Sequence, residues 1–446
     1  MSKVIKLKKG LDINLCGKAE SVVKGTVKSN LYAVKPTDFK ALTPKLSVKV
    51  GDTVLAGDAL FVDKLNPEVK FVSPVSGKVV EVARGERRKL LAVVVEADSK
   101  TEYKKFDVQG GTKEAIKATM LDAGVWPMVI QRPYGIIANA NVEPKAIYVS
   151  AFDSAPLAPD YQVALKGKEA DLNKGFEILS KLAGKPVNLG LKAGMESSIF
   201  ASMKNVEINY FDGPHPVGNV GIQIAHTSPI NKGEYVWTVN IQDVAIIGHL
   251  FNSGNYVAEK VVAVAGSGVA TPAYYQVTAG VKMDALLASQ SVADNYRVIC
   301  GNVLTGTKVA RDCYMCYYTN VVTVIPEGDH YEFMGWMMPG TKKFSASRLF
   351  GSFLCPKKEY DLDTNYNGEG RAFVVSGQYE NVLPMDIYPV YLLKAALAGD
   401  IDQMEQLGIY EVIPEDMALC EFVCTSKIPV QEILDNGIAL MMKETN

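Results

Sequence analysis

Two closely spaced pairs of cysteines are the residues whose types and spacing most directly suggest chemistry. Cys313 and Cys316 form the one Cys-x-x-Cys motif of the chain, and three residues separate Cys420 from Cys424. Thiolates at such spacings can bind zinc or an iron–sulfur cluster, but a complete site generally takes four close ligands. No further cysteine completes either set. We therefore interpret both pairs as small buried residues, with metal binding as the alternative for each pair.

Other motifs of catalysis or nucleotide binding are incomplete. Gly266–Gly268 follows a predicted strand, but Thr271 stands where a dinucleotide fingerprint has its third glycine, and Pro272 would break the helix that holds the phosphates. We predict a tight strand connection there. Four histidines lack any metal-ligand spacing: His215, His226, His249 and His330. The residues by themselves indicate no complete active site.

The stretch from Pro44 to Glu96 carries the clearest fold signal. Its short apolar runs are punctuated by Gly51-Asp52 and Gly57-Asp58, which is typical of short strands joined by tight turns. The pattern resembles the barrel-sandwich hybrid of biotinyl and lipoyl carrier domains. A working carrier has a lysine flanked by methionines at the hairpin tip, whereas this chain has Asp63–Pro67 there. We interpret Lys64 as a solvated turn lysine, not as a swinging arm.

A basic turn precedes the last strand of this stretch. Residues Arg84 to Lys89 read Arg-Gly-Glu-Arg-Arg-Lys. We predict a solvated loop, and the alternative is a docking site for an acidic partner.

Helical and strand-like patterns alternate in the middle of the chain. We predict helices over 112–123, 173–182 and 244–251 and strands over 146–150, 187–191 and 260–265. Such alternation favours an α/β layer with some parallel strand pairing.

The two ends of the chain follow other patterns. Val4–Leu7 and Ser29–Val34 are strand-like, and we expect them to add strands to the barrel-sandwich. Residues 295–380 are aromatic and predicted to be strand-rich. From Pro389 onward the pattern becomes helical, with Asp400 resembling a helix cap and a last helix over 430–442.

Length and composition limit the possible classes of protein. A chain of 446 residues exceeds what one hydrophobic core organises, so several domains are expected. The net charge of −2 disfavours nucleic-acid binding. No apolar stretch approaches the ~20 residues of a membrane span, and Met1–Gly10 lacks the apolar core of a signal peptide. Seven cysteines, an odd number, indicate reduced thiols in the cytoplasm.

These patterns predict an α+β multidomain protein in five parts. The parts are a barrel-sandwich (biotinyl/lipoyl-like) domain at 1–105, an α/β layer domain at 106–204, a soluble-ligand-binding β-grasp-like domain at 205–290, a β-rich domain at 291–386 and C-terminal helices at 387–446, which resemble a degenerate iron–sulfur domain.

Six segments in a fixed order make a family resemblance specific. They are Lys9–Asp12, Val50–Asp52, Phe71–Gly77, Gly213–Gly218, Gly335–Gly340 and Ala418–Cys424. Together they resemble the A subunit of the bacterial sodium-translocating NADH:quinone oxidoreductases, over nearly the whole chain. Part of the fold is also similar to the flavin-bearing subunit of respiratory complex I and to the C subunit of the Rnf complex.

Departures from the electron-input relatives define what this resemblance implies. Those relatives cradle a flavin phosphate in a glycine-rich loop. The corresponding stretch here looks like Ala123–Met128, where a tryptophan and a proline leave no room for such a cradle. Their acidic nicotinamide pocket looks replaced by the neutral Ser154–Leu157, and Cys420 and Cys424 look like the remnant of a cluster motif. The resemblance implies a subunit with no covalently bound cofactor and no redox centre of its own.

In the family, flavin, NADH and iron–sulfur centres belong to partner subunits, and sodium moves through membrane subunits. The resemblance implies a peripheral subunit on the cytoplasmic face of the bacterial inner membrane, associated with the reduction of quinone (ubiquinone) to quinol that is coupled to sodium export. Its implied partners are the other subunits, above all the membrane subunits, and the isolated chain is not expected to be catalytic. The alternatives are an Rnf-like electron-input subunit that binds flavin and NADH, and a non-catalytic assembly scaffold.

The loop that replaces the flavin cradle is the predicted quinone site. A quinone head needs apolar walls and one or two hydrogen-bond donors. Trp126 and Tyr134 offer ring surfaces, Met128 offers an adaptable wall, and Arg132 offers a donor. The alternative is that Trp126 and Pro127 fill the inherited cavity as core residues.

Overall fold

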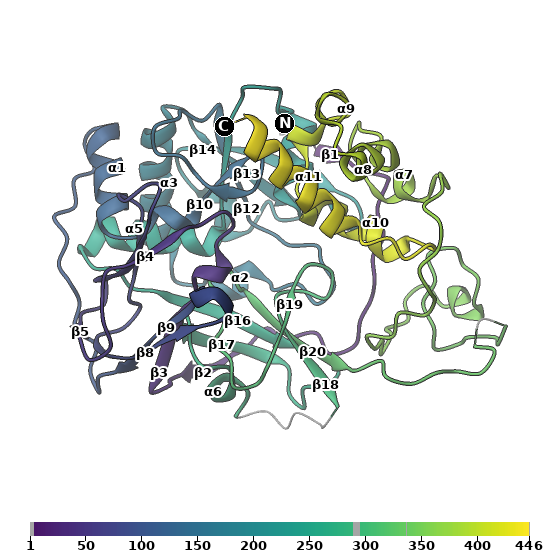
Figure 1. Cartoon of the computed structure of the whole chain (residues 1–446), viewed down its shortest axis with the longest axis horizontal. Coiled ribbons are helices and arrows are strands. Elements are labelled where there is room, and N and C mark those ends of the chain that lie inside the picture. Colours follow the sequence, from purple (N-terminus) through teal and green to yellow (C-terminus); the bar gives the residue numbers. More distant parts are fainter. Residues whose placement is uncertain (1–3, 289–294, 336, 446) are drawn as a thin grey trace.

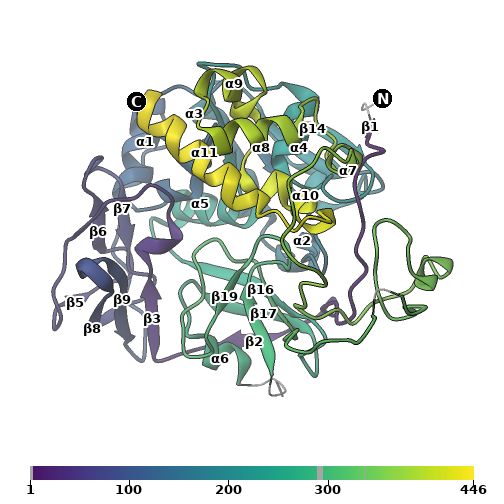
Figure 2. The ribbon, with the colours of Figure 1, turned by 45° about the vertical axis from the view of Figure 1, so that its right-hand side comes forward.

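The computed structural model describes residues 4–288, 295–335 and 337–445 and arranges them around four β-sheets (Figure 1). Sheets and helices are mixed along the chain, so the protein has the α+β multidomain fold that the sequence predicts. In both views the N-terminal sheets lie on one side of the molecule, and the long irregular segment after β20 lies on the opposite side (Figure 2).

Two small sheets form the barrel-sandwich region. The four-stranded sheet has the order β3-β9-β8-β5, and the three-stranded sheet has the order β4-β6-β7. The strands are β3 (Leu31–Val34), β4 (Pro44–Leu46), β5 (Thr53–Val54), β6 (Ala59–Asp63), β7 (Lys70–Val72), β8 (Gly77–Arg84) and β9 (Leu90–Ala97). Gly77 has φ +153°, and a Cβ there would lie 1.9 Å from the backbone oxygen of Glu96. Only glycine lets β8 approach β9 this closely.

The turn between β6 and β7 is the hairpin tip that contains Lys64. Residues 64–68 are exposed, and Asn66 Nδ2 donates a hydrogen bond to Asp63 Oδ2 over 2.8 Å. Lys64 is therefore an exposed lysine in an Asx-stabilised turn, and the interpretation that it is not a swinging arm stays a prediction.

A seven-stranded sheet forms the α/β layer. Its order is β1-β14-β13-β12-β15-β10-β11, and the neighbours from β1 to β15 pair in parallel, as the alternating pattern predicts. The strands are β1 (Val4–Lys6), β10 (Val129–Arg132), β11 (Ile136–Ile137), β12 (Ala146–Ser150), β13 (Val187–Lys192), β14 (Val206–Asp212) and β15 (Val236–Val239). The helices of this layer are α1 (Lys113–Asp122), α2 (Tyr161–Ala164), α3 (Glu169–Ala183), α4 (Val220–Thr227) and α5 (Ile241–Ser253).

Two glycines bring α3 and α5 into close contact. A Cβ on Gly175 would lie 2.2 Å from the Val244 backbone oxygen, and a Cβ on Gly248 would lie 1.8 Å from that of Asp171. The helix backbones therefore touch without intervening side chains at these two positions.

A six-stranded sheet lies below the α/β layer in Figure 1. Its order is β19-β18-β20-β16-β17-β2, and it contains β2 (Val23–Val27), β16 (Glu259–Ala265), β17 (Ala273–Thr278), β18 (Tyr296–Cys300), β19 (Thr307–Val309) and β20 (Val321–Pro326); α6 (Met283–Leu287) lies between β17 and β18. β16 and β17 are antiparallel neighbours, so the Gly266–Gly268 segment is the tight strand connection that we predict.

The N-terminal strands correct one expectation. Ser29–Val34 contains β3, which joins the barrel-sandwich through β9. Val4–Leu7 contains β1, which pairs instead with β14 of the α/β layer, and β2 pairs with β17 of the six-stranded sheet. A short alternating segment predicts a strand but does not specify its neighbour, because any open sheet edge offers the same hydrogen bonds.

The segment 295–380 also differs from expectation. Strands occupy it only to β20, and the described residues between Pro326 and Gln378 form turns, one 3₁₀ helix, η5 (Gly351–Leu354), and an isolated bridge from Tyr360 to Leu15. Residues 327–377 contain seven glycines, which favour turns over strands. Trp336, which belongs to this aromatic segment and to the Gly335–Gly340 motif, lies outside the described residues.

The chain ends in a layer of helices that packs in a second apolar cluster, which also includes Phe211 of β14 and Ala263 of β16. The helices are α7 (Gln378–Val382), α8 (Pro389–Ala398), α9 (Ile401–Gln406), η6 (Ile409–Glu411), η7 (Pro414–Met417), α10 (Ala418–Val423) and α11 (Val430–Thr445). Asp400 caps α9 by accepting a hydrogen bond from the Gln403 amide over 3.0 Å, as the sequence predicts. Within the described ranges no helix is both long and apolar enough to cross a membrane.

Residues 205–290, predicted as one domain, divide between two sheets. β14 and β15 belong to the seven-stranded sheet, whereas β16 and β17 belong to the six-stranded sheet. One apolar cluster runs from Tyr32 to Val324 through the barrel-sandwich and both larger sheets. The predicted domain boundaries at 105, 204, 290 and 386 remain predictions.

Candidate functional site

The predicted quinone loop, residues 126–134, begins inside the large apolar cluster that runs from Tyr32 to Val324. Trp126 to Met128 form a 3₁₀ turn, η3, that leads directly into β10. The Trp126 side chain is fully buried, and its Nε1 donates to the Ala138 oxygen over 2.7 Å. Its ring meets Trp237 edge-on, with 5.5 Å between ring centroids, and Met128 is buried in the same cluster. Trp126 and Met128 therefore act as packing residues in this structure.

Arg132 at the end of β10 forms a buried ion pair with the C-terminal helices. Its Nη1 lies 2.6 Å from Asp416 Oδ2 in η7, and its Nη2 lies 3.4 Å from Oδ1. The two side chains are 2% and 0% exposed. Asp416 Oδ2 also accepts a hydrogen bond from the Ile413 amide over 3.1 Å. The guanidinium fork is thus engaged by a carboxylate, and it joins the α/β layer to the helical layer.

A glycine leaves space for this ion pair. A Cβ on Gly221, in α4, would lie 2.3 Å from Arg132 Nη1 and 2.4 Å from Asp416 Oδ1. The sequence alone does not reveal this requirement, because the two charged residues lie 284 positions apart.

Tyr134 belongs to the second apolar cluster, the one that contains the C-terminal helices. It is 7% exposed, and its ring centroid lies 6.2 Å from that of Tyr410. Trp126 and Met128 belong to the main cluster, Tyr134 belongs to the C-terminal cluster, and Arg132 lies between them in sequence. The structure therefore divides the four predicted residues between two cores and does not gather them around one cavity.

His215 and Ser154 form a buried contact that sequence reasoning missed. His215 Nδ1 lies 2.9 Å from Ser154 Oγ, which accepts a hydrogen bond from the Gly218 amide over 2.8 Å. The hydroxyl and the imidazole therefore share a hydrogen bond, and the buried imidazole is neutral. Burial lowers the pKa of His215 to about 4. This contact holds the Gly213–Gly218 turn against the segment that follows β12.

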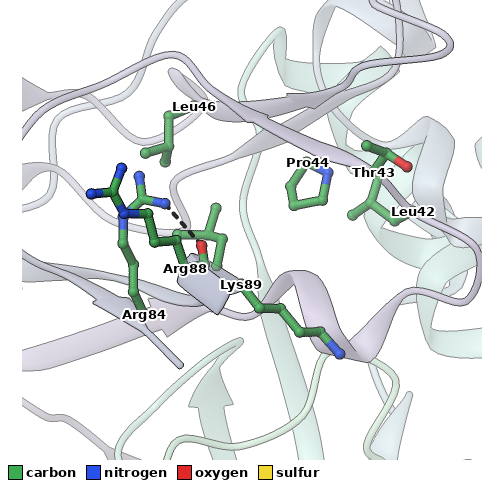
Figure 3. A pocket seen from close by; sticks show the side chains of 8 residues that line it. Leu42, Thr43, Pro44, Leu46, Arg84, Arg88 and Lys89 are labelled. Atoms are coloured by element: carbon green, nitrogen blue, oxygen red, sulfur yellow. Dashed lines mark hydrogen bonds between the residues drawn. The ribbon is translucent and has the colours of Figure 1, made fainter. Parts of the chain in front are cut away.

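The basic turn before β9 forms one side of a surface pocket (Figure 3). The pocket has a volume of about 390 Å³. Its lining residues are Leu42, Thr43, Pro44, Leu46, Arg84, Arg88, Lys89 and Leu90. Leu90 is buried, while the three basic side chains are exposed. The pocket therefore combines apolar walls with a cationic rim, and we call it the cationic pocket.

The rim of the cationic pocket has a defined backbone. Arg87 and Arg88 have φ values of 52° and 60°, a left-handed turn that directs successive basic side chains outward. Arg84 Nη1 donates to the Arg88 carbonyl oxygen over 3.1 Å (Figure 3). In the part of the chain that the structure describes, no carboxylate forms an ion pair with Arg84, Arg88 or Lys89. An anionic group from outside the chain can therefore approach all three.

The C-terminal cysteine pair lies in the helical core. Cys420 and Cys424 are buried, and the Tyr379 hydroxyl donates to Cys424 Sγ over 2.9 Å. This confirms our interpretation of that pair as buried residues. Cys313 and Cys316 are only half-buried in the loop after β19, so the interpretation as buried residues is wrong for that pair. Among the described residues, no three His, Cys, Asp or Glu side chains come together as a group that could hold a metal ion.

Comparison with known proteins gives a consistent result along the chain. Three family models match: "NqrA N-terminal barrel-sandwich hybrid domain" at residues 5–98, "NqrA second alpha/beta domain" at 111–256 and "NQRA C-terminal domain" at 261–311. The A subunit of the Na(+)-translocating NADH-quinone reductase of Haemophilus influenzae is 37% identical over 450 residues, covering 99% of this chain and 100% of that protein. The A subunits of Hahella chejuensis and Neisseria meningitidis are 35% and 36% identical, with the same coverage.

Proposed function

Because the chain belongs to the family formed by the A subunits of Na(+)-translocating NADH-quinone reductases, we propose that it is a peripheral, quinone-associated subunit on the cytoplasmic face of the bacterial inner membrane. The observation that carries this proposal is similarity over the full length to relatives named as that subunit. Quinone reduction to quinol and sodium export are then activities of the assembled complex, and this chain contributes to them through its contacts with partner subunits.

The cationic pocket supports the partner contact. Its exposed guanidinium groups lie beside apolar walls. A partner segment that presents a carboxylate next to an aliphatic or aromatic side chain would therefore match the pocket in charge and in polarity. Within our proposal, such an acidic segment of a membrane subunit docks there.

Flotation with protein-free liposomes separates a protein partner from a lipid partner. We expect the purified chain to remain unbound to anionic liposomes at physiological salt, because a pocket on one turn presents too few cations for stable lipid binding. Strong co-flotation would contradict docking through partner subunits.

The proposal also assigns no redox centre to this chain. Trp126 and Pro127 are buried where the resemblance places the flavin cradle, and Cys420 and Cys424 are packed among apolar side chains. We expect the purified chain to be colourless and to contain little iron or zinc. A visible flavin spectrum, or near-stoichiometric metal by elemental analysis, would favour the electron-input alternative instead.

We also propose that a quinone contacts Trp126, Met128, Arg132 and Tyr134. In the structure these side chains are covered, so the contact requires a movement of the chain. Trp126 and Met128 are core residues, and Asp416 engages the guanidinium of Arg132. A quinone would therefore reach Arg132 only if η7 moved away from β10, and it would reach the ring of Tyr134 only if Tyr410 in η6 moved as well.

Tryptophan fluorescence tests this condition during titration with a short-chain quinone. Saturable quenching that disappears in Trp126→Phe would support contact at this loop. Equal quenching in the wild type and the variant would place the quinone elsewhere, most simply on a neighbouring membrane subunit.

A further inference from the structure

The irregular loop that follows β20 concentrates exposed apolar side chains more than any other described segment of the chain. We call its described residues, 329–335 and 337–358, the outer loop. Eight large apolar residues are exposed there; Tyr331 and Phe333 are almost fully exposed, and Leu354 is 73% exposed. Single exposed apolar residues are common on soluble proteins, but a group of this size in one segment is typical of an interaction surface.

Contacts with two distant parts of the chain hold the base of the outer loop. The Tyr360 amide donates to the Asn14 carbonyl oxygen over 2.8 Å, and the Tyr360 carbonyl oxygen accepts from the Cys16 amide over 2.9 Å. The ring of Phe344 packs against that of Phe422 in α10, with 5.9 Å between ring centroids. This segment lies on the side of the molecule opposite the barrel-sandwich sheets (Figures 1 and 2), so it is separate from the cationic pocket.

Internal contacts give the outer loop a defined shape. Lys343 forms an ion pair with Glu332, and its Nζ donates to the Gly335 carbonyl oxygen over 3.0 Å. The Gly351 amide donates to the Pro339 carbonyl oxygen over 2.9 Å. These bonds tie the two halves of the loop together. The apolar side chains are therefore presented from an organised backbone, which reduces the entropy that is lost on binding.

The charges of the outer loop favour an acidic partner. Residues 329–358 include five lysines or arginines and two acidic residues, in a chain whose net charge is −2. Glu332 is already paired with Lys343. Within the described residues, no carboxylate forms an ion pair with the exposed Lys342, Arg348 or Lys357. A partner that supplies carboxylates beside an apolar face therefore complements the outer loop in charge and in polarity.

We propose that the outer loop is a docking surface for another protein, and that the docked segment is an amphipathic helix whose apolar face is edged by aspartate and glutamate. Met334, Met337 and Met338 are among the exposed residues, and their unbranched side chains can adapt to the face of a helix. The inference rests on the proposed function in one respect, because that function makes the helix part of a partner subunit.

Two other occupants fit the outer loop less well. Chain that inserts into a lipid bilayer must satisfy its backbone hydrogen bonds internally, but the described residues of the outer loop form turns and the short η5, with no α-helix or strand. A symmetric contact with a second copy of this chain would place one basic outer loop against another, and like charges repel.

The test is photo-crosslinking in cells whose only copy of the full-length chain carries p-benzoylphenylalanine in place of Phe333 or of Leu354. The same substitution at Leu65, which is also 73% exposed but lies on the hairpin tip of the barrel-sandwich, is the matched control. Mass spectrometry identifies the labelled peptide.

We expect the Phe333 and Leu354 positions to label one segment of another protein, with apolar residues three and four positions apart and carboxylates beside them. The Leu65 position should not label it. Labelling of lipid, of a second copy of this chain or of a segment without carboxylates would overturn the proposal, as would the lack of any adduct.

Charge reversal tests the electrostatic part of the proposal. Lys342→Glu/Arg348→Glu, combined with the photo-crosslinker at Phe333, should lower the adduct yield about tenfold. Lys342→Arg/Arg348→Lys keeps both charges and should retain most of the yield. Both residues are exposed, so thermal unfolding should be the same in the two variants. Equal adduct yields in the two variants would contradict the proposal.

Failure of this proposal can be distinguished from failure of the proposed function. Loss of the adduct in a chain that still recovers membrane subunits would overturn the docking surface alone. An adduct with an acidic helix of a protein outside the reductase would support the docking surface and contradict the proposed function.

Discussion

Arg132 and the arginines of the cationic pocket are the same residue type in opposite environments. Arg132 is 1% exposed, and its guanidinium lies 2.6 Å from Asp416. Arg84 and Arg88 are exposed at the rim of the cationic pocket. A buried arginine must have a fixed carboxylate because an unpaired charge in the interior is costly, whereas an exposed one keeps its donors for a partner. The comparison suggests that Arg132 stabilises the fold and that the cationic pocket serves assembly.

Removing the buried cation should give the largest effect. Arg132→Met leaves the Asp416 carboxylate buried without its cation, and we expect the free energy of unfolding to fall by about 3–5 kcal/mol. Denaturant unfolding followed by circular dichroism measures the loss. Arg84→Met is the matched control, with an expected change within about 0.5 kcal/mol. Equal losses of stability in Arg132→Met and Arg84→Met would show that the buried arginine is no more important for the fold than the exposed one.

Buried groups should also make the stability of the fold depend on pH, and His215 is the one with the clearest expected effect. Its pKa is lowered to about 4 by burial, below the ordinary value near 6.5. Between these values the unfolded chain binds a proton more readily than the folded chain. Stability is therefore fully present above pH ~6.5 and falls as the pH drops toward 4, by about 3 kcal/mol in total.

Unfolding measured between pH 7 and 4 checks this expectation. His215→Asn should flatten the dependence, and His330→Gln, at an exposed histidine, should retain it. A wild-type dependence that survives in His215→Asn would assign the effect to other groups.

A smaller loss of stability is expected when a methyl group is added beside the Arg132–Asp416 ion pair. The Cβ of Gly221→Ala would lie 2.3 Å from Arg132 Nη1, so the pair or α4 must shift, with an expected loss of about 1–3 kcal/mol. Gly111→Ala is the matched control, because nothing lies within 4 Å of a Cβ there. Thermal unfolding of both variants measures the difference, and a neutral Gly221→Ala would show that the pair is more adaptable than its geometry suggests.

Local features of the fold could be predicted from the sequence, and contacts between distant segments could not. The Gly-Asp turns of residues 44–96 and the cap at Asp400 depend on near neighbours, and the structure contains both. The Arg132–Asp416 pair spans 284 positions and Lys35–Cys316 spans 281. No local pattern marks such pairs.

The candidate sites show the same division. The basic run Arg84–Lys89 is visible in the sequence, but its apolar walls come partly from Leu42–Leu46 on another strand. Trp126 and Arg132 have the residue types of a quinone site, yet their surroundings are set by Trp237 and Asp416. Residue type alone does not distinguish a ligand contact from a packing contact, because both use aromatic rings and arginine.

Affinity recovery of partner subunits tests the central claim most directly. Tagged full-length chain is incubated with detergent-solubilised membranes from a strain that lacks its own copy of this chain, beside the double variant Arg84→Glu/Arg88→Glu. Lys24→Glu/Lys28→Glu, with the same spacing on exposed β2 and its flank, is the matched control. We predict that the wild type and the control recover membrane subunits and that the Arg84→Glu/Arg88→Glu variant, equally stable, recovers at least tenfold less, a loss of about 1.4 kcal/mol or more. Recovery of no membrane subunit by the wild type, or equal recovery by all three, would contradict the account.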